Sequence, residues 1–371
     1  MKISFPLKRS QRFIASLRPG DLMGLPKEFD INYYDYPLPE HLIAYYPPKE
    51  RVKSKLLVII RKEEKLLFHE SFSEIINYFG EGDLLVLNNT KVFPARLKLR
   101  KKTGSLVELL LFKKPEGLFF ETEALVKGKR LKEGSELFSE EGKLKVVLLQ
   151  NLGGGKFKVR LESEALPLDE LIQKIGKAPL PPYIKREPEE IDLLRYQTVF
   201  AEKEGSIAAP TAGFHFDREL LENLEKKGVK ITYITLHVGY GTFAPIKVRD
   251  IRLHRVEPEY VEVSEETIDE IVKALEEKRR VIACGTTVTR TLEFIARKGF
   301  KPYKGLCDLY IYPGFEFKVV SALITNFHLP RSSLLLLVCA FAGRSLIFKA
   351  YEEAIKRGYR FYSYGDATFI I

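Results

Sequence analysis

The sequence predicts an α/β layer domain, with helices packed over a mixed sheet, together with a small β-barrel. Between residues 56 and 163, short apolar strands follow one another with few helices, which is typical of a small barrel. After a proline-rich connection at residues 178–190, strands and amphipathic helices alternate, which is typical of an α/β layer. A chain of 371 residues exceeds the usual size of one core, so two domains are expected, with one elaborated domain as the alternative.

The β-rich region contains six strand-like runs. In chain order they are LLVII, DLLVLNN, LVELLLF, LFFETEALV, KLKVVLLQ and KFKVRLES. The turn NLGGG between the last two runs supplies residues that tolerate the positive φ angles of a hairpin. These last two strands are therefore expected to pair directly.

The helices that follow carry signals at their ends. FDRELLENLEKKG shows an apolar face and ends at Gly228, and Ser264 is the expected N-cap of the next helix. In that helix the apolar residues recur at i, i+3, i+4 and i+7; they are Ile268, Ile271, Val272 and Leu275. The strand VIACG then leads into TTVTRTLEFIARKG, a helix closed by Gly299.

The end of the chain contains the longest apolar run and a last strand. LLLLVCAFA, from Leu334 to Ala342, is nine residues long, well short of the roughly 20 that a membrane-spanning helix needs. It is expected to be a buried helix, and the alternating segment YRFYSYGDATFI is expected to return to the sheet as a strand.

Composition limits the compartment and the partner. The 60 Lys and Arg residues against 50 Asp and Glu residues give a net charge of +10, which suits a polyanionic partner. Cys284, Cys307 and Cys339 lie in apolar surroundings without CxxC spacing, which argues against a disulfide frame or a zinc site and favours the cytosol. The first 28 residues are basic and lack a long apolar core, so they are expected to be a flexible extension rather than a secretory signal.

The commonest nucleotide-binding motifs are missing, and several tight loops at strand ends take their place. No GxGxxG follows a strand and no GxxxxGK[ST] occurs, so neither a standard dinucleotide fold nor a P-loop is supported. In AAPTAGFHF, Pro210 and Gly213 bend the chain before His215, which stands at a helix start where its pKa is lowered and it stays available as a base. The alternative is a packed histidine between two phenylalanines.

Two further loops carry histidines. In ITLHVGYGTF, His237 ends a strand, and Gly239 and Gly241 let the backbone approach a ligand closely; the alternative is a tight turn with a buried histidine. In LITNFHLPRSS, Asn326 and His328 precede a proline, and Ser332 or Ser333 caps the following helix. Here the alternative is that Asn326 only satisfies turn backbone.

The loop VIACGTTVTR carries hydroxyls at a helix start. The strand ends at Gly285, and Thr286 and Thr287 follow where free backbone N–H groups begin the helix. Such a terminus can hold a carboxylate or a phosphate, with Arg290 about one turn further on. The alternative is that the threonines simply cap the helix.

The spacing of the histidines does not favour a metal site. No pair shows i, i+2 or i, i+4 spacing and no HExxH occurs among His215, His237, His254 and His328. No metal is therefore expected.

A basic stretch, KVFPARLKLRKKT, lies at residues 91–103 and contains no acid. If LKLRKK is a strand, then Lys98, Arg100 and Lys102 point to one side and can follow phosphates. The alternative is a solvated edge strand whose charge prevents aggregation.

Taken together, these motifs resemble one family, S-adenosylmethionine:tRNA ribosyltransferase-isomerase of queuosine biosynthesis. The resemblance runs in order through LPEHLIAYYP, GDLLVLNNTKVFPARL, APLPPYI, YQTVFAEKEGSIAAPTAGFHF, TLHVGYGTF, YPGFEFKVVSALITNFHLPRSSLLLLVCAFAG and YRFYSYGDATFI. Two places depart from the family pattern. CGTTVTRTLE stands where GTTSVRTLE is common, and Glu257 stands where many members have a second histidine.

The resemblance implies an α/β catalytic domain with an inserted antiparallel β-barrel domain. The α/β domain is expected at residues 31–80 and 165–371, the barrel at 81–164, and a basic extension outside the resemblance at 1–30. The implied reaction moves the ribosyl part of S-adenosylmethionine onto 7-aminomethyl-7-deazaguanine at the tRNA wobble position and isomerises it to epoxyqueuosine, with release of adenine and methionine. S-Adenosylmethionine is then a cosubstrate, no metal or membrane is needed, and a cytoplasmic monomer is expected.

The same resemblance gives the loops their roles. The catalytic candidates are His215, His237 and His328, with His254 behind them. The candidates for binding S-adenosylmethionine are Gly239, Gly241, Thr242, Gly285, Thr286, Thr287 and Arg290. The candidates for binding tRNA are Lys91, Arg96, Lys98, Arg100 and Lys102. The competing functions are an S-adenosylmethionine-dependent RNA methyltransferase, a noncatalytic RNA-binding protein and a metal-dependent hydrolase.

Overall fold

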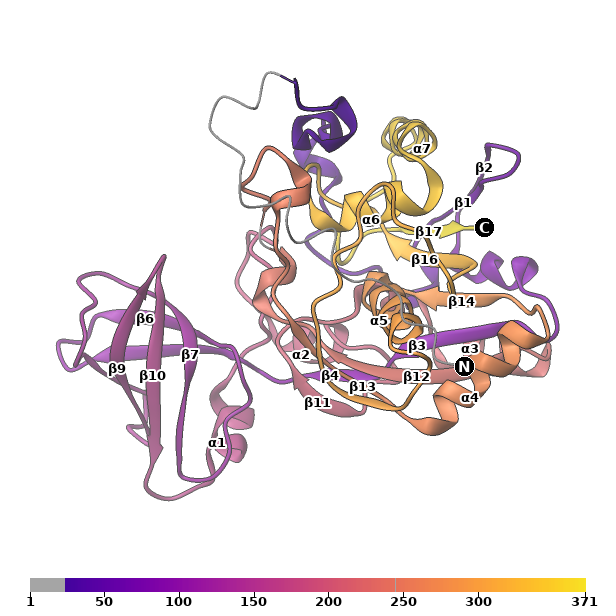
Figure 1. The fold of residues 1–371 in the computed structure, drawn as a ribbon. Coiled ribbons are helices and arrows are strands. Elements are labelled where there is room, and N and C mark those ends of the chain that lie inside the picture. The colour runs from indigo at the N-terminus through magenta and orange to yellow at the C-terminus, as the bar shows by residue number, and fades with distance from the viewer. Residues whose placement is uncertain (1–23, 244) are drawn as a thin grey trace, which may run out of the picture.

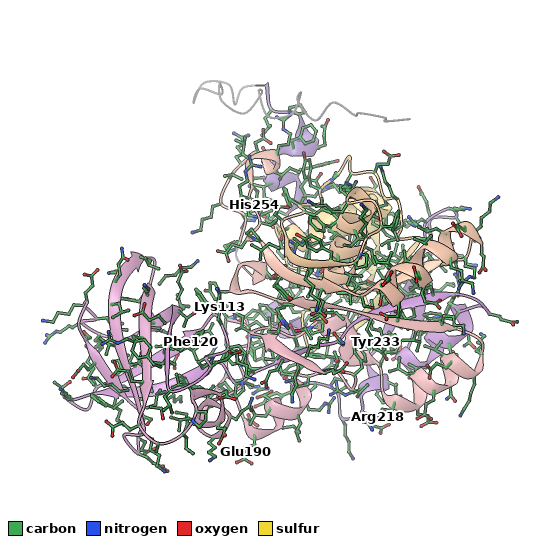
Figure 2. The ribbon with its side chains drawn as sticks, turned by 60° about the horizontal axis from the view of Figure 1, so that its bottom comes forward. Lys113, Phe120, Glu190, Arg218, Tyr233 and His254 are labelled. Carbon is green, nitrogen blue, oxygen red and sulfur yellow. The ribbon has the colours of Figure 1, made fainter. Side chains whose placement is uncertain are left out.

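A computed structural model describes residues 24–243 and 245–371, so most of the expected basic extension lies outside the described residues. The described chain forms a large mixed sheet covered by helices and a closed β-barrel that stands to one side of it (Figure 1). In the view of Figure 2, Lys113 and Phe120 lie on the barrel, whereas Tyr233 lies on the large sheet.

The large sheet has nine strands. In spatial order they are β15 (Tyr303–Cys307), β13 (Glu259–Val263), β12 (Lys230–His237), β3 (Leu84–Asn88), β14 (Val281–Cys284), β16 (Ala322–Asn326), β17 (Ala367–Ile370), β1 (Leu56–Ile60) and β2 (Lys65–His69). The four central strands β12, β3, β14 and β16 are parallel to one another. Their carboxyl ends therefore lie at one edge of the sheet.

Helices cover both faces of this sheet. Alternate residues of the central strands point to opposite faces: Leu84 and Val86 pack in one core, and Leu85 and Leu87 in the other. The first core is covered by α4 (Glu265–Glu276), α5 (Thr286–Arg297), α6 (Ser333–Ala342) and α7 (Arg344–Lys356). The second is covered by α3 (Arg218–Lys226) and the 3-10 helix η6 (Phe72–Tyr78).

The barrel is antiparallel and has its own core. Its strands, in order around the barrel, are β10 (Lys156–Ser163), β7 (Phe119–Lys127), β6 (Leu106–Leu111), β5 (Arg96–Lys101), β8 (Glu136–Phe138) and β9 (Leu144–Gly153). Inward residues such as Leu97 and Leu99 alternate with outward polar ones. Helix α1 (Leu168–Ile175) packs its apolar face into this core, and β4 (Thr90–Val92) pairs with β11 (Lys203–Ser206) beside it.

The predicted fold class is confirmed, with one difference in the assignment of strands. LLVII and LLVLN, assigned to the β-rich region, form β1 and β3 of the large sheet. Of these two, β3 lies within the segment 81–164 that was expected to form the barrel. The physical reason lies in their burial. β1 and β3 are buried on both faces and are almost uniformly apolar, whereas the barrel strands alternate.

The helix N-caps predicted from the sequence are confirmed. Ser264 Oγ accepts from the Thr267 amide at 3.3 Å, and Ser332 Oγ accepts from the Leu335 amide at 3.2 Å, so both serines cap their helices. Of the final alternating segment, only Ala367–Ile370 is a strand. Among the described helices, none alone is long and apolar enough to cross a membrane. Only α6 and α7 taken together reach that length and apolar character, and this pair is bent by 113°.

Candidate active site

A cavity of about 250 Å³ opens where the parallel strands end. The loops that leave β12, β14 and β16 contribute Val238, Gly285 and Phe327 to its lining. Ligands in open α/β sheets bind at this edge, in the crevice outside the carboxyl ends of the strands. The strand-end loops selected from the sequence are therefore brought together by the parallel pairing of these strands.

One wall of the cavity is the start of α5. Gly285 has φ +97° and turns the strand into the helix, a conformation that favours glycine. No side chain caps the helix, so the alternative of capping threonines is not seen. Thr286 and Thr287 line the cavity instead, and the Thr287 hydroxyl accepts a hydrogen bond from Asn88 Nδ2 at 3.4 Å. The free amides of the first turn therefore lie at the cavity wall without an internal partner.

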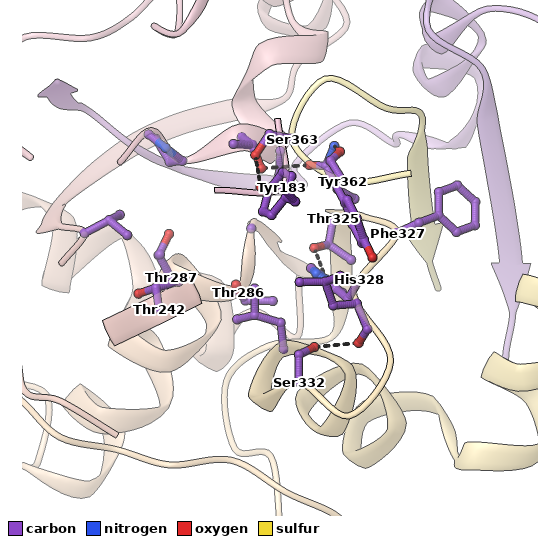
Figure 3. Close-up of a pocket in the computed structure, with 18 of the residues that line it drawn as sticks. Tyr183, Thr242, Thr286, Thr287, Thr325, Phe327, His328, Ser332, Tyr362 and Ser363 are labelled. Atoms are coloured by element: carbon purple, nitrogen blue, oxygen red, sulfur yellow. Dashed lines mark hydrogen bonds between the residues drawn. The ribbon is translucent and has the colours of Figure 1, made fainter. Parts of the chain in front are cut away.

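The opposite wall comes from the loop after β16. Figure 3 shows Thr286 and Thr287 on one side of the cavity and His328, with Thr325, on the other. The ring of Phe327 points away from the cavity and packs against Phe361, with the ring centroids 4.7 Å apart. The buried phenylalanine thus anchors the loop and sets the direction of the histidine that follows.

His328 is held as a neutral imidazole. Its side chain is buried, and desolvation lowers its pKa from 6.5 to about 3. Nε2 lies 2.9 Å from the Thr325 hydroxyl, whereas Nδ1 makes no hydrogen bond with the described residues. The backbone is fixed as well, because the His328 N–H donates a hydrogen bond to the Tyr351 hydroxyl oxygen at 3.1 Å.

An aromatic wall completes the cavity. The rings of Tyr183 and Tyr362 lie 4.7 Å apart between centroids, and the Tyr183 hydroxyl lies 2.5 Å from Ser363 Oγ. Tyr362 has φ +72° and Arg331, also in the lining, has φ +55°. Non-glycine residues rarely adopt such angles, and they persist where the surrounding structure imposes them, often at functional sites.

His215 lies behind the cavity rather than in its lining. It is buried, Asn326 Nδ2 donates to its Nε2 at 3.2 Å, and its Nδ1 lies 2.7 Å from Ser54 Oγ. Because Nε2 accepts, Nδ1 carries the proton and donates to the serine, whose own hydroxyl donates to the Arg51 carbonyl. Burial lowers the pKa of His215 to about 3. Asn326 does line the cavity, so His215 contacts the wall through it.

The other two histidines also lie outside the lining. His237 Nδ1 is 2.7 Å from the Thr90 hydroxyl, its ring stacks on Tyr260, and burial lowers its pKa. His254 packs edge-on against Tyr310, and burial lowers its pKa too. Of the four histidines, only His328 lines the cavity.

Arg290 serves the neighbouring loop and does not line the main cavity. Its Nη1 donates to Glu259 at 2.5 Å and its Nε to the Leu309 carbonyl at 2.9 Å. Glu259 also accepts from the Gly239 amide at 2.9 Å and from the Thr242 hydroxyl at 2.7 Å. The carboxylate thus ties α5 to the GYGTF loop, from which Thr242 reaches the main cavity.

Comparison with known proteins identifies the family. A family model described as Queuosine biosynthesis protein matches residues 31–370. The S-adenosylmethionine:tRNA ribosyltransferase-isomerase of Aquifex aeolicus is 52% identical over 343 residues, covering 92% of this chain and 99% of that protein. The chain belongs to the queuosine biosynthesis protein family.

Other members of the family agree with this assignment. The S-adenosylmethionine:tRNA ribosyltransferase-isomerase of Thermotoga petrophila is 49% identical over 344 residues, covering 92% of this chain and 99% of that protein. The crystal structure of an S-adenosylmethionine tRNA ribosyltransferase from Thermotoga maritima, at 2.00 Å resolution, aligns with 93% of this chain and 100% of that chain. The two structures share 37% identity at a TM-score of 0.52. The resemblance drawn from the sequence blocks is thereby confirmed.

Glu257, the departure from the family pattern, has a structural role in this chain. Its carboxylate lies 3.3 Å from Lys156 Nζ on β10 of the barrel. It also packs against Gly241 so closely that a Cβ at that glycine would lie 2.6 Å from a carboxylate oxygen. A side chain at Gly241 would displace this carboxylate, and Glu257 joins the GYGTF loop to the barrel.

The expected tRNA-binding residues are placed unevenly. Lys98 and Arg100 do point outward from β5, as the alternation predicted, and Arg96 lies on the same side; the strand ends at Lys101, before Lys102. Four of the five candidates have partners. Lys98 pairs with Glu187 at 2.7 Å and Lys102 with Glu136 at 2.5 Å, whereas the Arg96 Nη2 donates to the Leu180 carbonyl at 3.0 Å and the Arg100 Nη1 to the Gly104 carbonyl at 3.1 Å. Lys91 and Arg100 are exposed and have no acidic partner among the described residues.

Several lining residues were not selected from the sequence. Tyr183, Tyr362 and Ser363 come from the proline-rich connection and from the C-terminal segment. Both segments, APLPPYI and YRFYSYGD, were part of the family resemblance, which was the available signal. Among the described residues, no group of three or more His, Cys, Asp or Glu side chains is placed to hold a metal ion.

Proposed function

We propose that the cavity at the carboxyl edge of the parallel strands binds S-adenosylmethionine together with the modified base of tRNA. As a member of its family, the protein transfers and isomerises the ribosyl part of S-adenosylmethionine onto 7-aminomethyl-7-deazaguanine in tRNA, giving epoxyqueuosine. The observation that carries the assignment to this cavity is the convergence of an uncapped helix start, a neutral histidine and two tyrosines on one space.

The start of α5 is proposed to hold the methionine carboxylate. The helix has 12 residues, and the free amides of its first turn carry the positive end of the helix dipole. Thr286 and Thr287 add hydroxyl donors at the same place. The carboxylate would replace the side-chain cap that this helix lacks. Arg290 is proposed to act indirectly, through Glu259 and the GYGTF loop, rather than by contacting the ligand.

Tyr183 and Tyr362 are proposed to stack on a flat ring, either the adenine of the cosubstrate or the modified base. Both rings lie in the lining, and aromatic stacking on a base contributes about 1 to 3 kcal/mol. The modified base comes from the anticodon loop, where a single-stranded nucleotide leaves its stack at low cost. The left-handed backbone of Tyr362 supports this role, because strain of this kind accumulates at ligand sites.

His328 is proposed to accept the proton that the isomerisation removes. The positive sulfonium makes the adjacent carbon acidic, so a neutral base within reach is required. His328 remains neutral at physiological pH because its pKa is about 3. If Nε2–H donates to the Thr325 hydroxyl, the lone pair of Nδ1 is left for the substrate, so Thr325 sets the required tautomer. His215 is proposed to act as a positioning residue that orients Asn326.

The proposed arrangement at the level of the chain is a catalytic α/β domain with the barrel as a separate unit that approaches tRNA. The exposed Lys91 and Arg100 would contact phosphates. We also propose that the protein acts without a metal, as a monomer in the cytoplasm.

The test measures free adenine and the wobble nucleoside by mass spectrometry after single turnover with S-adenosylmethionine and tRNA bearing 7-aminomethyl-7-deazaguanine. We expect His328→Gln to lower the single-turnover rate by about 100-fold or more, as loss of a general base does, while tRNA affinity changes less than about threefold. His41→Gln, at an exposed histidine outside the cavity, is the matched control. A wild-type rate in His328→Gln would remove His328 from the role of base.

A further inference from the structure

A second cavity, of about 260 Å³, lies between the barrel and the GYGTF loop. One wall is the outer face of β5, β6 and β7, and the other includes Leu180, Ile207 and Tyr240. None of the residues that line it lines the first cavity. We infer that this second cavity binds the unstacked base of a nucleotide next to the modified one, an inference that rests on the proposed binding of that modified base in the first cavity.

The two cavities are close neighbours. Three segments contribute to both cavities. In the first segment Ile207 lines the second cavity and Ala209 the first, and in the next segment Tyr240 lines the second cavity and Thr242 the first. The third segment runs from Leu180 to Tyr183. Two residues of chain span at most roughly 7 Å. A distance of this order suits two successive nucleotides of a single strand.

The barrel wall presents a ladder of outward side chains to the second cavity. The strand register places Arg96 opposite Leu110 and Leu110 opposite Leu125, so one row carries a cation and two leucines. In the next row Glu108 lies opposite Lys127. Charges of both signs beside apolar surface suit a base, because its edge carries both donors and acceptors and its faces are apolar. An apolar side chain would leave these charged groups unpaired, whereas the donors and acceptors of a base edge can pair with them.

Two details favour a ligand at this place. The Nε of Arg96 is buried and has no hydrogen-bond partner among the described residues, although Nη2 donates to Leu180. One face of Tyr240 stacks on Phe112 of the barrel, with the centroids 5.5 Å apart and the planes 20° apart. This stacking holds the tyrosine ring in the lining of the cavity as a preformed platform.

The energetic reason for such a site follows from the first cavity. When the modified nucleotide leaves the stack, its neighbour loses one stacking face, and this loss opposes binding. Stacking of the neighbouring base on Tyr240 would increase the affinity for the RNA by about 5- to 100-fold, the usual effect of an aromatic platform. The second cavity would therefore compensate for the opening of the anticodon loop.

The experiment is a thermodynamic cycle between the protein and the RNA. Dissociation constants are measured by fluorescence anisotropy at fixed salt, without S-adenosylmethionine, for an anticodon stem-loop bearing 7-aminomethyl-7-deazaguanine. The same RNA is made with an abasic residue at the 5′ or the 3′ neighbour of the modified nucleotide. Wild type is compared with Tyr240→Leu, and Tyr233→Leu on the large sheet is the matched control.

We expect one abasic substitution to weaken binding to wild type and to Tyr233→Leu by about 5- to 100-fold, but binding to Tyr240→Leu by less than about threefold. An abasic effect of equal size in wild type and Tyr240→Leu at both neighbours would overturn the inference. If thermal unfolding shows that Tyr240→Leu is not folded, Glu108→Ala on the barrel takes its place in the same cycle. The cycle needs no turnover, so it can fail or succeed independently of the roles proposed for His328 and α5.

Discussion

The hydrogen bond between His215 and Asn326 shows how a single buried residue can shape a site that it does not line. Asn326 uses both amide hydrogens, toward His215 Nε2 and the Tyr362 carbonyl, and its oxygen accepts from the Thr211 hydroxyl. Every polar atom of this side chain is therefore committed to one orientation. The histidine selected from the sequence as the first candidate base thus fixes the wall rather than facing the cavity.

Replacing His215 with alanine is expected to lower the free energy of unfolding by about 2 to 4 kcal/mol. The change removes a buried ring and leaves Ser54 Oγ and Asn326 Nδ2 each without one partner. Urea unfolding measures the loss. His69→Ala is the matched control, because His69 is only half-buried and has one side-chain partner, the Tyr78 hydroxyl at 2.6 Å. Losses of equal size in the two variants would contradict the role assigned to His215.

At the scale of elements, the GYGTF loop depends on α5 through Glu259. The Glu259 carboxylate accepts three hydrogen bonds and is buried together with Arg290. The ion pair therefore joins strand β13, which carries Glu259, to α5 and to the GYGTF loop. Removing one partner of a buried pair leaves an uncompensated charge, which costs about 3 to 5 kcal/mol. Glu259→Gln and Arg290→Met should each destabilise the protein by an amount of this order.

The double variant should cost at least about 1 kcal/mol less than the sum of the two single variants, because the second change removes the charge that the first left unpaired. Both single variants should also raise the KM for S-adenosylmethionine, since Glu259 holds Thr242 and Arg290 holds Glu259. Lys203→Met with Glu262→Gln, a more exposed pair at 2.7 Å, is the control and should be additive and nearly neutral. Additive losses for the buried pair would show that the two side chains act independently.

The predictable part of the site follows from local patterns. VIACGTT and LITNFH each place polar residues directly after an apolar run, and parallel pairing brings those ends to one edge. The sequence marked Gly285, Thr286, Thr287 and His328 as candidates, and the structure places all four in the lining of one cavity. The helix ends were readable for the same reason, because a cap such as Ser264 lies within a few residues of the amide that it satisfies.

The part that could not be predicted depends on pairs that are distant in the chain. Glu259 and Arg290 are 31 residues apart, and His215 and Asn326 are 111 residues apart. No periodicity or spacing encodes such a pair, so Arg290 was expected at the ligand and His215 at the reacting atoms. The uniformly apolar β1 and β3 carried a signal for burial on both faces, which their position before the barrel strands obscured.

At the scale of the whole molecule, buried neutral histidines make stability depend on pH. The pKa of both His215 and His328 is lowered by burial from 6.5 to about 3. Between these values the unfolded chain binds more protons than the folded one, so stability is complete above pH 6.5 and is lost as the pH falls toward 3. From pH 7 to pH 5 the two residues should together remove about 4 kcal/mol.

Urea unfolding at pH 7 and pH 5 measures this loss. The window lies above the usual pKa values of carboxylates, so histidines dominate the change. His328→Gln should reduce the loss by about 2 kcal/mol, whereas His41→Gln, at an exposed position, should leave it unchanged. An unaltered loss in His328→Gln would mean that this histidine is not held neutral by the fold.

The net charge of +10 makes association with tRNA dependent on salt, and the structure divides the basic residues into two groups. Lys98 and Lys102 are neutralised by Glu187 and Glu136, whereas Lys91 and Arg100 have no acidic partner among the described residues.

Replacing Lys91 or Arg100 with alanine should reduce the slope of log K against log salt by about 0.7 to 0.9, the value for one phosphate contact. Lys102→Ala should change the slope much less, because in tRNA binding its ammonium must first give up Glu136. Binding titrations between roughly 50 and 200 mM salt separate the two groups. Equal slopes for Lys102→Ala and Arg100→Ala would show that the ion pairs do not restrain the lysines.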